Sequence, residues 1–335
     1  MIDARTLLLY ALFCLPLVPT ISAQNDQKKP QTWEEKKARL QVITEEKKED
    51  LRAASPQTAT ANPSADRRIL VFWRCEGFVH GSIPTGNAAL EALGKVTGAF
   101  AADFADDYSV FESENLAKYD LILFNNTTRL TFPNPTHRQA VLDFLAQGKG
   151  VAGIHAASDN FANWAEGLQM MGGIFNGHPW NAGGTWAFKL EDAEHPLNAS
   201  FNNQGFWLKD EIYQYKPESF VGDENLRVLV SLDMTKSPNI AVLLKSKKKG
   251  KEPEAKTEEE AKARRVPVSW IREFKGGRVF YSNLGHNDST YYNTAVLQHY
   301  LDGIQYALGD LSADATPSAN MEDLKVQLAP DELPQ

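Results

Sequence analysis

Four histidines stand at positions where an imidazole can do chemistry, in glycine-containing loops at the ends of apolar runs. Of the seven histidines in the chain, these are His80, His155, His178 and His286. Imidazole changes charge near neutral pH and binds metal ions, so each can move protons or hold an ion. Two adjacent carboxylates, Asp210 and Glu211, add candidate bases. Neighbouring side chains of a strand point to opposite faces, so we expect at most one of them in the site and the other paired with Arg or Lys.

These groups allow two kinds of chemistry. In one, Asp210 or Glu211 works with His155 and His286 to remove and return protons at carbon. In the other, His155, His286 and Asp210 hold one divalent ion that polarises a carbonyl or a water. The sequence has no HExxH motif and no cysteine pair, so a metal site depends on the fold bringing separate loops together. Structural roles remain open, such as His155 capping the following helix or His80 fixing its loop.

Side chains beside these motifs are expected to contact a ligand. They are His80, Asn125, Thr127, His178, Trp180 and Tyr213. The aromatic pair is chosen because it adjoins the motifs, although aromatic residues are also ordinary core material. Cys75 follows the first apolar run and is interpreted as a bystander thiol.

Alternating strands and helices must position these residues. Apolar runs at 69–73, 99–104, 120–125 and 150–154 predict buried strands, and residues 84–96 and 135–146 predict helices between them. This alternation indicates a parallel sheet, in which ligands bind beyond the carboxyl ends of the strands. Further strands are predicted in the second half, with a closing helix at 292–308; the strand ranges are 185–190, 227–232, 240–244, 266–274 and 278–283.

The composition and the termini restrict the class of protein. The net charge of −8 over 335 residues argues against nucleic-acid binding by bulk charge, and two cysteines argue against a disulfide scaffold. Residues 1–23 resemble a signal peptide, which predicts export to the periplasm or outside the cell and no membrane span after cleavage. A charged, partly helical linker is expected at 24–66, the main domain at 67–310 with a charged surface insertion at 245–265, and a tail at 311–335.

Five short motifs in order carry a family resemblance. They are Gly77-Phe-x-His80-x-Ser-Ile-Pro84, Gly153-Ile-His155-Ala-Ala-x-Asp159, His178-Pro179, Asp210-Glu211-x-Tyr213 and Gly285-His286. From about residue 68 to 309 the chain resembles the ThuA-like (trehalose utilization) family of the class I glutamine amidotransferase-like superfamily. The resemblance implies a flavodoxin-like, three-layer α/β sandwich with a mainly parallel central sheet. It also implies a link to saccharides, including 3-keto-glycosides.

One departure from the superfamily narrows the chemistry. In the amidotransferases a nucleophilic cysteine follows the strand that ends in Gly-Ile, whereas His155 follows Gly153-Ile154 here. We therefore do not expect glutamine hydrolysis. The expected function is an exported enzyme that cleaves or isomerises glycosides or 3-keto-glycosides, with a small saccharide as ligand and one divalent ion as a candidate cofactor. The alternative is a non-catalytic carbohydrate-binding or scaffold domain.

Overall fold

The computed structural model describes residues 31–219, 222–245 and 252–333. The chain divides into two compact units, Met1–Thr32 and Trp33–Gln335, and the features below belong to the second. The signal peptide predicted over residues 1–23 lies outside the described residues. Among the described residues, no helix has the length and apolar character needed to cross a lipid bilayer.

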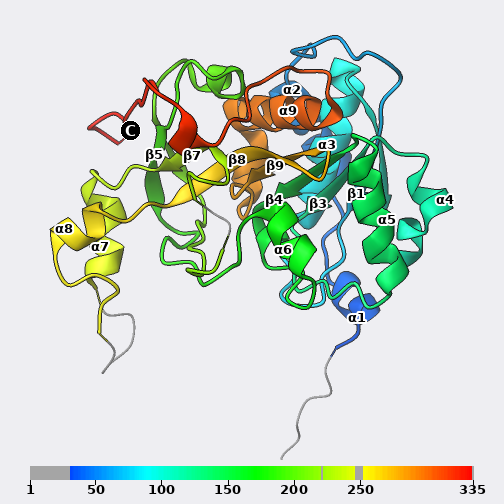
Figure 1. The fold of residues 1–335 in the computed structure, drawn as a ribbon, viewed down its shortest axis with the longest axis horizontal. Coiled ribbons are helices and arrows are strands. Elements are labelled where there is room, and N and C mark those ends of the chain that lie inside the picture. Colours follow the sequence, from blue (N-terminus) through cyan, green and yellow to red (C-terminus); the bar gives the residue numbers. More distant parts are fainter. Residues whose placement is uncertain (1–30, 220–221, 246–251, 334–335) are drawn as a thin grey trace, which may run out of the picture. The chain divides into compact units, whose positions relative to one another are not determined.

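A sheet of nine strands forms the centre of the described chain, in the order β2-β1-β3-β4-β9-β8-β7-β5-β6 (Figure 1). The first part is parallel and consists of β2 (Ala101–Ala105), β1 (Arg68–Phe72), β3 (Leu121–Asn125), β4 (Gly150–Ile154) and β9 (Gly277–Ser282). An antiparallel part continues it from β9 through β8 (Pro267–Phe274), β7 (Arg227–Leu232), β5 (Thr185–Leu190) and β6 (Phe206–Lys209). The predicted α/β fold with a sheet that is parallel at its core is confirmed.

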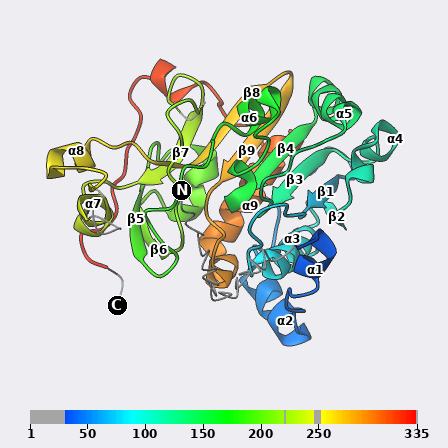
Figure 2. The same ribbon diagram turned by 90° about the horizontal axis from the view of Figure 1, so that it is seen from below.

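Helices cover both faces of the sheet, which makes three layers (Figure 2). On one face lie α2 (Glu45–Ala54), α3 (Ile83–Thr97) and α9 (Thr294–Leu308), and on the other α4 (Ser113–Leu116), α5 (Pro135–Ala146) and α6 (Ala165–Met171). Ile69 and Val71 of β1 belong to the first core, and Leu70 and Phe72 to the second. Because successive side chains of a strand point to opposite faces, a strand buried on both faces needs an unbroken apolar run.

The remaining helices are short. They are α1 (Trp33–Lys37), α7 (Ser237–Leu244), α8 (Glu258–Lys262) and the 3-10 turns Tyr108–Phe111, His155–Ser158, Pro196–Phe201, Asp288–Tyr292 and Ser318–Asn320. The predicted strand at 240–244 is wrong, because these residues belong to α7. Pro238 stands in the first turn, and Asn239, Ile240 and Leu243 are buried at helical spacing. A short apolar run cannot by itself separate a buried helix from a buried strand.

The predicted linker and tail both contact the main domain. In the linker predicted at 24–66, the backbone N–H groups of Thr60 and Ala61 donate to Gln305 Oε1 on α9. In the tail, Gln327 pairs with Leu190 of β5, and Ala329 is buried. Composition does not reveal these contacts, since each depends on a partner far along the chain.

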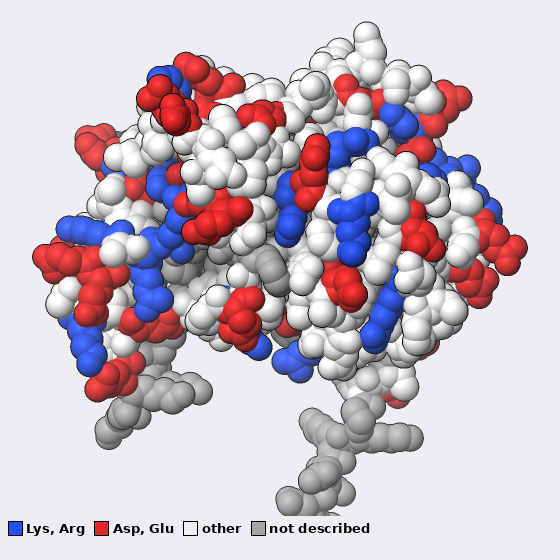
Figure 3. Space-filling model, viewed as in Figure 1, with Lys and Arg blue, Asp and Glu red and all other residues white. Residues whose placement is uncertain are grey.

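The charged insertion lies around α7 and α8. Residues 246–251 are outside the described part, while Ala255 and Ala261 are buried against α7 and its neighbours. Figure 3 shows basic and acidic side chains interspersed over the face seen in Figure 1, with both kinds gathered over α7 and α8. Within the described residues of this insertion, Lys256 pairs with Glu252 and Lys262 pairs with Glu258.

Candidate functional site

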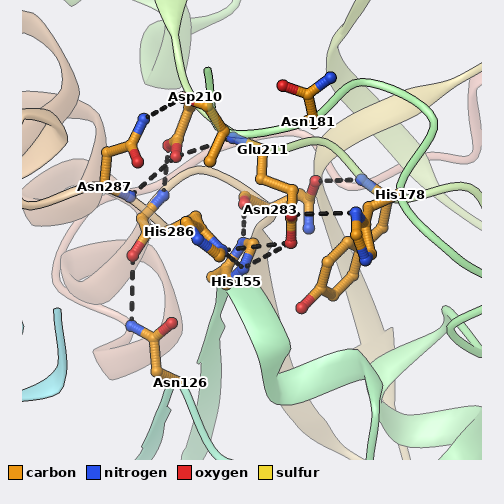
Figure 4. Close-up of polar contacts among 12 residues, drawn as sticks. Asn126, His155, His178, Asn181, Asp210, Glu211, Asn283, His286 and Asn287 are labelled. Carbon is orange, nitrogen blue, oxygen red and sulfur yellow. Dashed lines mark hydrogen bonds and ion pairs between the residues drawn. The ribbon is translucent and has the colours of Figure 1, made fainter. Parts of the chain in front are cut away.

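The fold brings the histidine loops together at the carboxyl edge of the sheet (Figure 4). His155 directly follows β4, His286 follows β9, and His80 lies between β1 and α3. Glu211 comes from the antiparallel part, two residues beyond the end of β6. Residues from both parts of the sheet therefore meet in one place, as expected for a ligand site at the carboxyl ends of parallel strands.

His155 occupies a sharp turn at the end of β4. Its φ is +49°, in the left-handed region that non-glycine residues rarely adopt, and it is fully buried. The Tyr281 hydroxyl donates a 2.6 Å hydrogen bond to the His155 carbonyl. Such backbone conformations persist when their surroundings hold them and are frequent at functional sites.

The tautomer of His155 follows from its neighbours. Its Nδ1 lies 2.7 Å from the Asn283 carbonyl oxygen, which only accepts, so Nδ1 carries the proton and Nε2 is free to accept a proton or bind a metal. Burial, aided by the charges of His80 and His286, holds the His155 pKa well below its ordinary value. At neutral pH this ring is therefore uncharged, as a metal-binding imidazole must be.

Glu211 is the carboxylate at the centre of the cluster. Its Oε1 lies 3.1 Å from His286 Nδ1 and 3.8 Å from His155 Nε2, and its Oε2 lies 3.0 Å from His178 Nδ1. Burial lowers the pKa of His286, but the hydrogen bond and charge of Glu211 outweigh it, so the pKa is raised overall. Glu211 and His286 can therefore share or exchange a proton.

His80 completes the cluster with an unpaired ring nitrogen. Its ring lies 4.8 Å from that of His155 and 5.1 Å from that of His286, measured between centroids. Its Nδ1 is buried and has no hydrogen-bond partner. Burial, together with the charges of His286 and His178, lowers its pKa to about 3. A buried polar atom without a partner costs free energy, so it points to something that binds there.

The four groups suit a divalent ion. One ligand atom from each of His80, His155, Glu211 and His286 can be chosen so that all lie within 4.8 Å of one another. A tetrahedral ion with bonds of about 2.1 Å places its ligands about 3.4 Å apart. The separations among His155 Nε2, His286 Nδ1 and Glu211 Oε1 are 3.3, 3.1 and 3.8 Å. Three imidazoles and a carboxylate favour Zn²⁺ or a similar first-row ion.

Asp210 has a different place from the one we expected. Its oxygens accept from the backbone N–H groups of Glu211, Gly285 and Asn287 and from the Thr290 hydroxyl. Burial raises the pKa of Asp210, and these hydrogen bonds oppose the rise. Because its lone pairs serve the backbone on both sides of His286, Asp210 positions the loop rather than binding a metal, and its partners are neither Arg nor Lys.

The loop that Asp210 holds needs a glycine. Gly285 has a φ of +126°, and a Cβ there would lie 2.8 Å from the Tyr291 hydroxyl and 2.9 Å from Ile154 Cγ2. A side chain at this position would therefore displace the loop that carries His286.

Three predicted ligand contacts are absent from the lining of the cavity that the histidines share. The Asn125 amide donates to Asn87, Thr127 Oγ1 accepts from Asn160, and the Trp180 indole donates to the Asn239 carbonyl. All three side chains are buried within the protein, where they join loops and pack the core. Position beside a motif therefore does not show which way a side chain points.

A cavity of about 320 Å³ opens onto the cluster. Its lining includes the predicted residues His80, His178, Glu211, Tyr213 and His286, and also Phe78, Thr128, Arg129, Asp159 and Phe175, which we did not predict. Phe78 and Asp159 belong to two of the five family motifs, so these motifs could have indicated them. Arg129 and Phe175 carry no such signal.

Cys75 takes no part in this cavity. Its buried thiol donates to the Asn126 carbonyl, and burial raises its pKa to about 11. It therefore remains a thiol at neutral pH and is a poor nucleophile.

Comparisons with known proteins agree with this architecture. The sequence model of the ThuA family, described as trehalose utilisation, matches residues 68–307. A putative ThuA-like protein of Bacteroides uniformis ATCC 8492 is 21% identical, with a TM-score of 0.56, over 74% of this chain and 94% of that one. Another, from Parabacteroides merdae ATCC 43184, is 16% identical, with a TM-score of 0.52, over 75% of this chain and 93% of that one. No curated protein matches the chain. At these identities the structural likeness shows the shared fold.

Proposed function

We propose, since the chain belongs to the ThuA (trehalose utilisation) family, that it is an enzyme acting on saccharides. The observation that supports the proposal is the cluster of His80, His155, Glu211 and His286, of which His80, Glu211 and His286 line a cavity. The reaction that fits these groups is proton transfer at a sugar carbon beside a carbonyl, which isomerises a 3-keto-glycoside or cleaves it by eliminating the group on its anomeric carbon.

The cavity wall supports a saccharide as ligand. Phe78 is 67% exposed, and its ring lies 4.9 Å from that of His80. Phe175 packs 4.4 Å from Tyr213 on the same cavity. Aromatic faces pack against the C–H faces of sugar rings, while imidazoles and carboxylates bind the hydroxyl groups.

A divalent ion fits this donor set. His80 and His155 are uncharged at neutral pH, and the Nδ1 of His80 lacks a partner. The ion would supply a Lewis acid for a carbonyl oxygen. Glu211 would bind the ion and neutralise part of its charge.

Proton transfer then falls to His178. Its Nδ1 contacts Glu211 Oε2 at 3.0 Å, its side chain is 49% exposed, and it lines the cavity. The contact with Glu211 orients the ring and leaves the other nitrogen for a substrate proton. The same arrangement without an ion would leave Glu211 and His286 as an acid–base pair.

Metal binding is the first test. The purified chain would be analysed for bound metals, then stripped and titrated with Zn²⁺ and Mn²⁺ by calorimetry. We expect one ion per chain, and about a 100-fold weaker affinity for Glu211→Gln and for His80→Ala. His137→Ala is the matched control, because His137 on α5 also has an unpaired Nδ1 but, among the described residues, belongs to no group of three or more metal-ligating side chains. Equal affinity of all four proteins would contradict the assignment.

Proton transfer is the second test. Methyl 3-keto-glucoside would be incubated with the metal-loaded protein in D₂O, and deuterium uptake at the carbons beside the carbonyl followed by NMR. We expect uptake with the wild type and about a 100-fold slower rate with His178→Ala. Tight binding of saccharides without exchange or turnover would favour a carbohydrate-binding domain instead. Export of the protein stays a prediction from the sequence.

A further inference from the structure

A two-stranded segment forms part of the wall of the histidine cavity. Its strands, residues 174–180 and 212–216, run antiparallel and are joined by backbone hydrogen bonds. Phe175, His178 and Tyr213 of this segment line the histidine cavity. A second cavity is lined by other residues of the same segment, namely Asn176, Trp180, Gln214, Tyr215 and Lys216. The two cavities share no lining residue, so a ligand can bind in one and leave the other open.

The second cavity is large enough for a small molecule and has an apolar floor. Its volume is about 460 Å³, within the range of about 300–1,000 Å³ that is common for ligand sites. Trp180, Leu243 and Val266 line it and are buried. Tyr215 is half-buried and adds an aromatic ring to the lining. A flat, apolar ring can pack against these side chains.

The charged residues of this lining are mainly basic. They are Lys216, Arg264 and Arg265, with Glu254 as the acidic one. Arg265 already pairs with two carboxylates, and Arg264 Nη2 donates to the Glu254 carbonyl oxygen at 3.0 Å. Within residues 31–219, 222–245 and 252–333, neither Lys216 nor Arg264 forms an ion pair with a carboxylate. Two cations without anionic partners beside a cavity favour a negatively charged ligand.

We propose that the second cavity binds a small organic anion that carries an aromatic ring, with a phosphate monoester or a carboxylate as its charged group. The guanidinium of Arg264 presents planar N–H groups that match two oxygens of such an anion, and Lys216 adds a positive charge. The ring packs on the apolar floor formed by Trp180, Leu243 and Val266. The site is separate from the histidine cavity, so the inference does not depend on the function proposed for that cavity.

The test compares four probes on the full chain, treated with a chelator so that no bound metal attracts the anion. Phenyl phosphate, benzoate, inorganic phosphate and benzyl alcohol would each be titrated by calorimetry. We expect phenyl phosphate or benzoate to bind about tenfold or more tightly than inorganic phosphate and benzyl alcohol, and less tightly as salt is added. The tighter of the two identifies the charged group. If neither binds, or if inorganic phosphate binds as tightly, the proposal is wrong.

Four variants of exposed cations assign the binding to one cavity. Lys216→Gln and Arg264→Gln should each weaken the tighter probe about fivefold. Arg129→Gln is one control, because Arg129 lines the histidine cavity and a neighbouring cavity that includes Lys216. Lys262→Gln is the other, because Lys262 lines a cavity that includes Arg264 but not Lys216. Both controls remove one positive charge and should bind like the wild type. A fivefold loss in either control would place the anion in another cavity and overturn the proposal.

Discussion

Two clusters of buried polar residues use the same residue types in different ways. On α9, His299 is fully buried, and its Nε2 contacts the Ser269 hydroxyl at 2.8 Å while its Nδ1 contacts the Leu197 carbonyl at 2.7 Å. In the histidine cavity, His80 is also buried, with 4% of its surface exposed, but its Nδ1 has no partner. Burial lowers the pKa of both rings, to about 4 in His299 and about 3 in His80.

The comparison shows that burial and pKa do not separate a structural histidine from a binding one. Two features together do so for His80: its Nδ1 has no hydrogen-bond partner, and three other metal-ligating side chains lie around it. Within the described part of the chain, His137 has only the first of these features. Substitutions on α9 should therefore reduce stability, and substitutions in the cavity should reduce binding.

The largest effect on stability is expected from His299→Ala. The substitution empties a buried site and leaves the Leu197 carbonyl without its donor, so the free energy of unfolding should fall by about 3 kcal/mol. Urea denaturation of the metal-free chain measures this, and metal affinity of the folded fraction should be unchanged. Loss of the metal with little loss of stability would reverse the roles we assign to the two clusters.

Asp210→Asn tests a residue that lies beside the cavity but has complete partners. An amide cannot accept at both positions, so one side of the side chain would face backbone N–H groups with its own N–H₂. We expect the free energy of unfolding to fall by about 2 kcal/mol and, because the His286 loop shifts, metal affinity to fall about tenfold. A loss of affinity as large as that of Glu211→Gln would instead make Asp210 a ligand.

A pH series tests Asp302, a second buried polar residue of α9. Asp302 accepts from Thr60 and Gln298, and burial raises its pKa from 3.8 to about 6. Between these values the folded state binds more protons than the unfolded state, so stability falls as pH rises from about 4 to 6. The free energy of unfolding of Asp302→Asn, relative to wild type, should therefore rise by about 2 kcal/mol between pH 4 and 7. A constant difference across the series would contradict the shift.

The sequence predicted those features of the fold and site that depend on nearby residues. Unbroken apolar runs predicted β1, β3 and β4, and three of the histidines at strand ends, His80, His155 and His286, lie close together in the structure. The sequence could not separate Asp210 from Glu211, because the difference depends on which carboxylate faces the histidine side chains and which accepts from the backbone of the loop after β9. For the same reason α7 was mistaken for a strand, and Arg129 and Phe175 were missed. Their roles come from contacts between distant segments, which composition and spacing do not contain.

The smallest effect on stability and binding is expected at α1, a short helix that contacts the loop carrying His80. Lys36 on α1 donates from its Nζ to the carbonyl oxygens of Glu76 and Gly77, at 3.0 and 2.8 Å, just before Phe78 and His80. Lys36→Ala should leave stability within about 1 kcal/mol of wild type. It should weaken metal and saccharide binding only a few-fold, because the His80 loop keeps its other contacts.

Lys37→Ala is the matched control for this contact. Lys37 lies on the same helix but pairs with Asp106 instead of the His80 loop. Calorimetric titration of both variants with Zn²⁺ should therefore separate them, with a weaker affinity only for Lys36→Ala. Equal affinities would mean that α1 covers the loop without positioning it. The position of His80 would then be set by contacts of the β1–α3 loop other than that with Lys36. One of these is the hydrogen bond that the Thr128 hydroxyl donates to the Phe78 carbonyl.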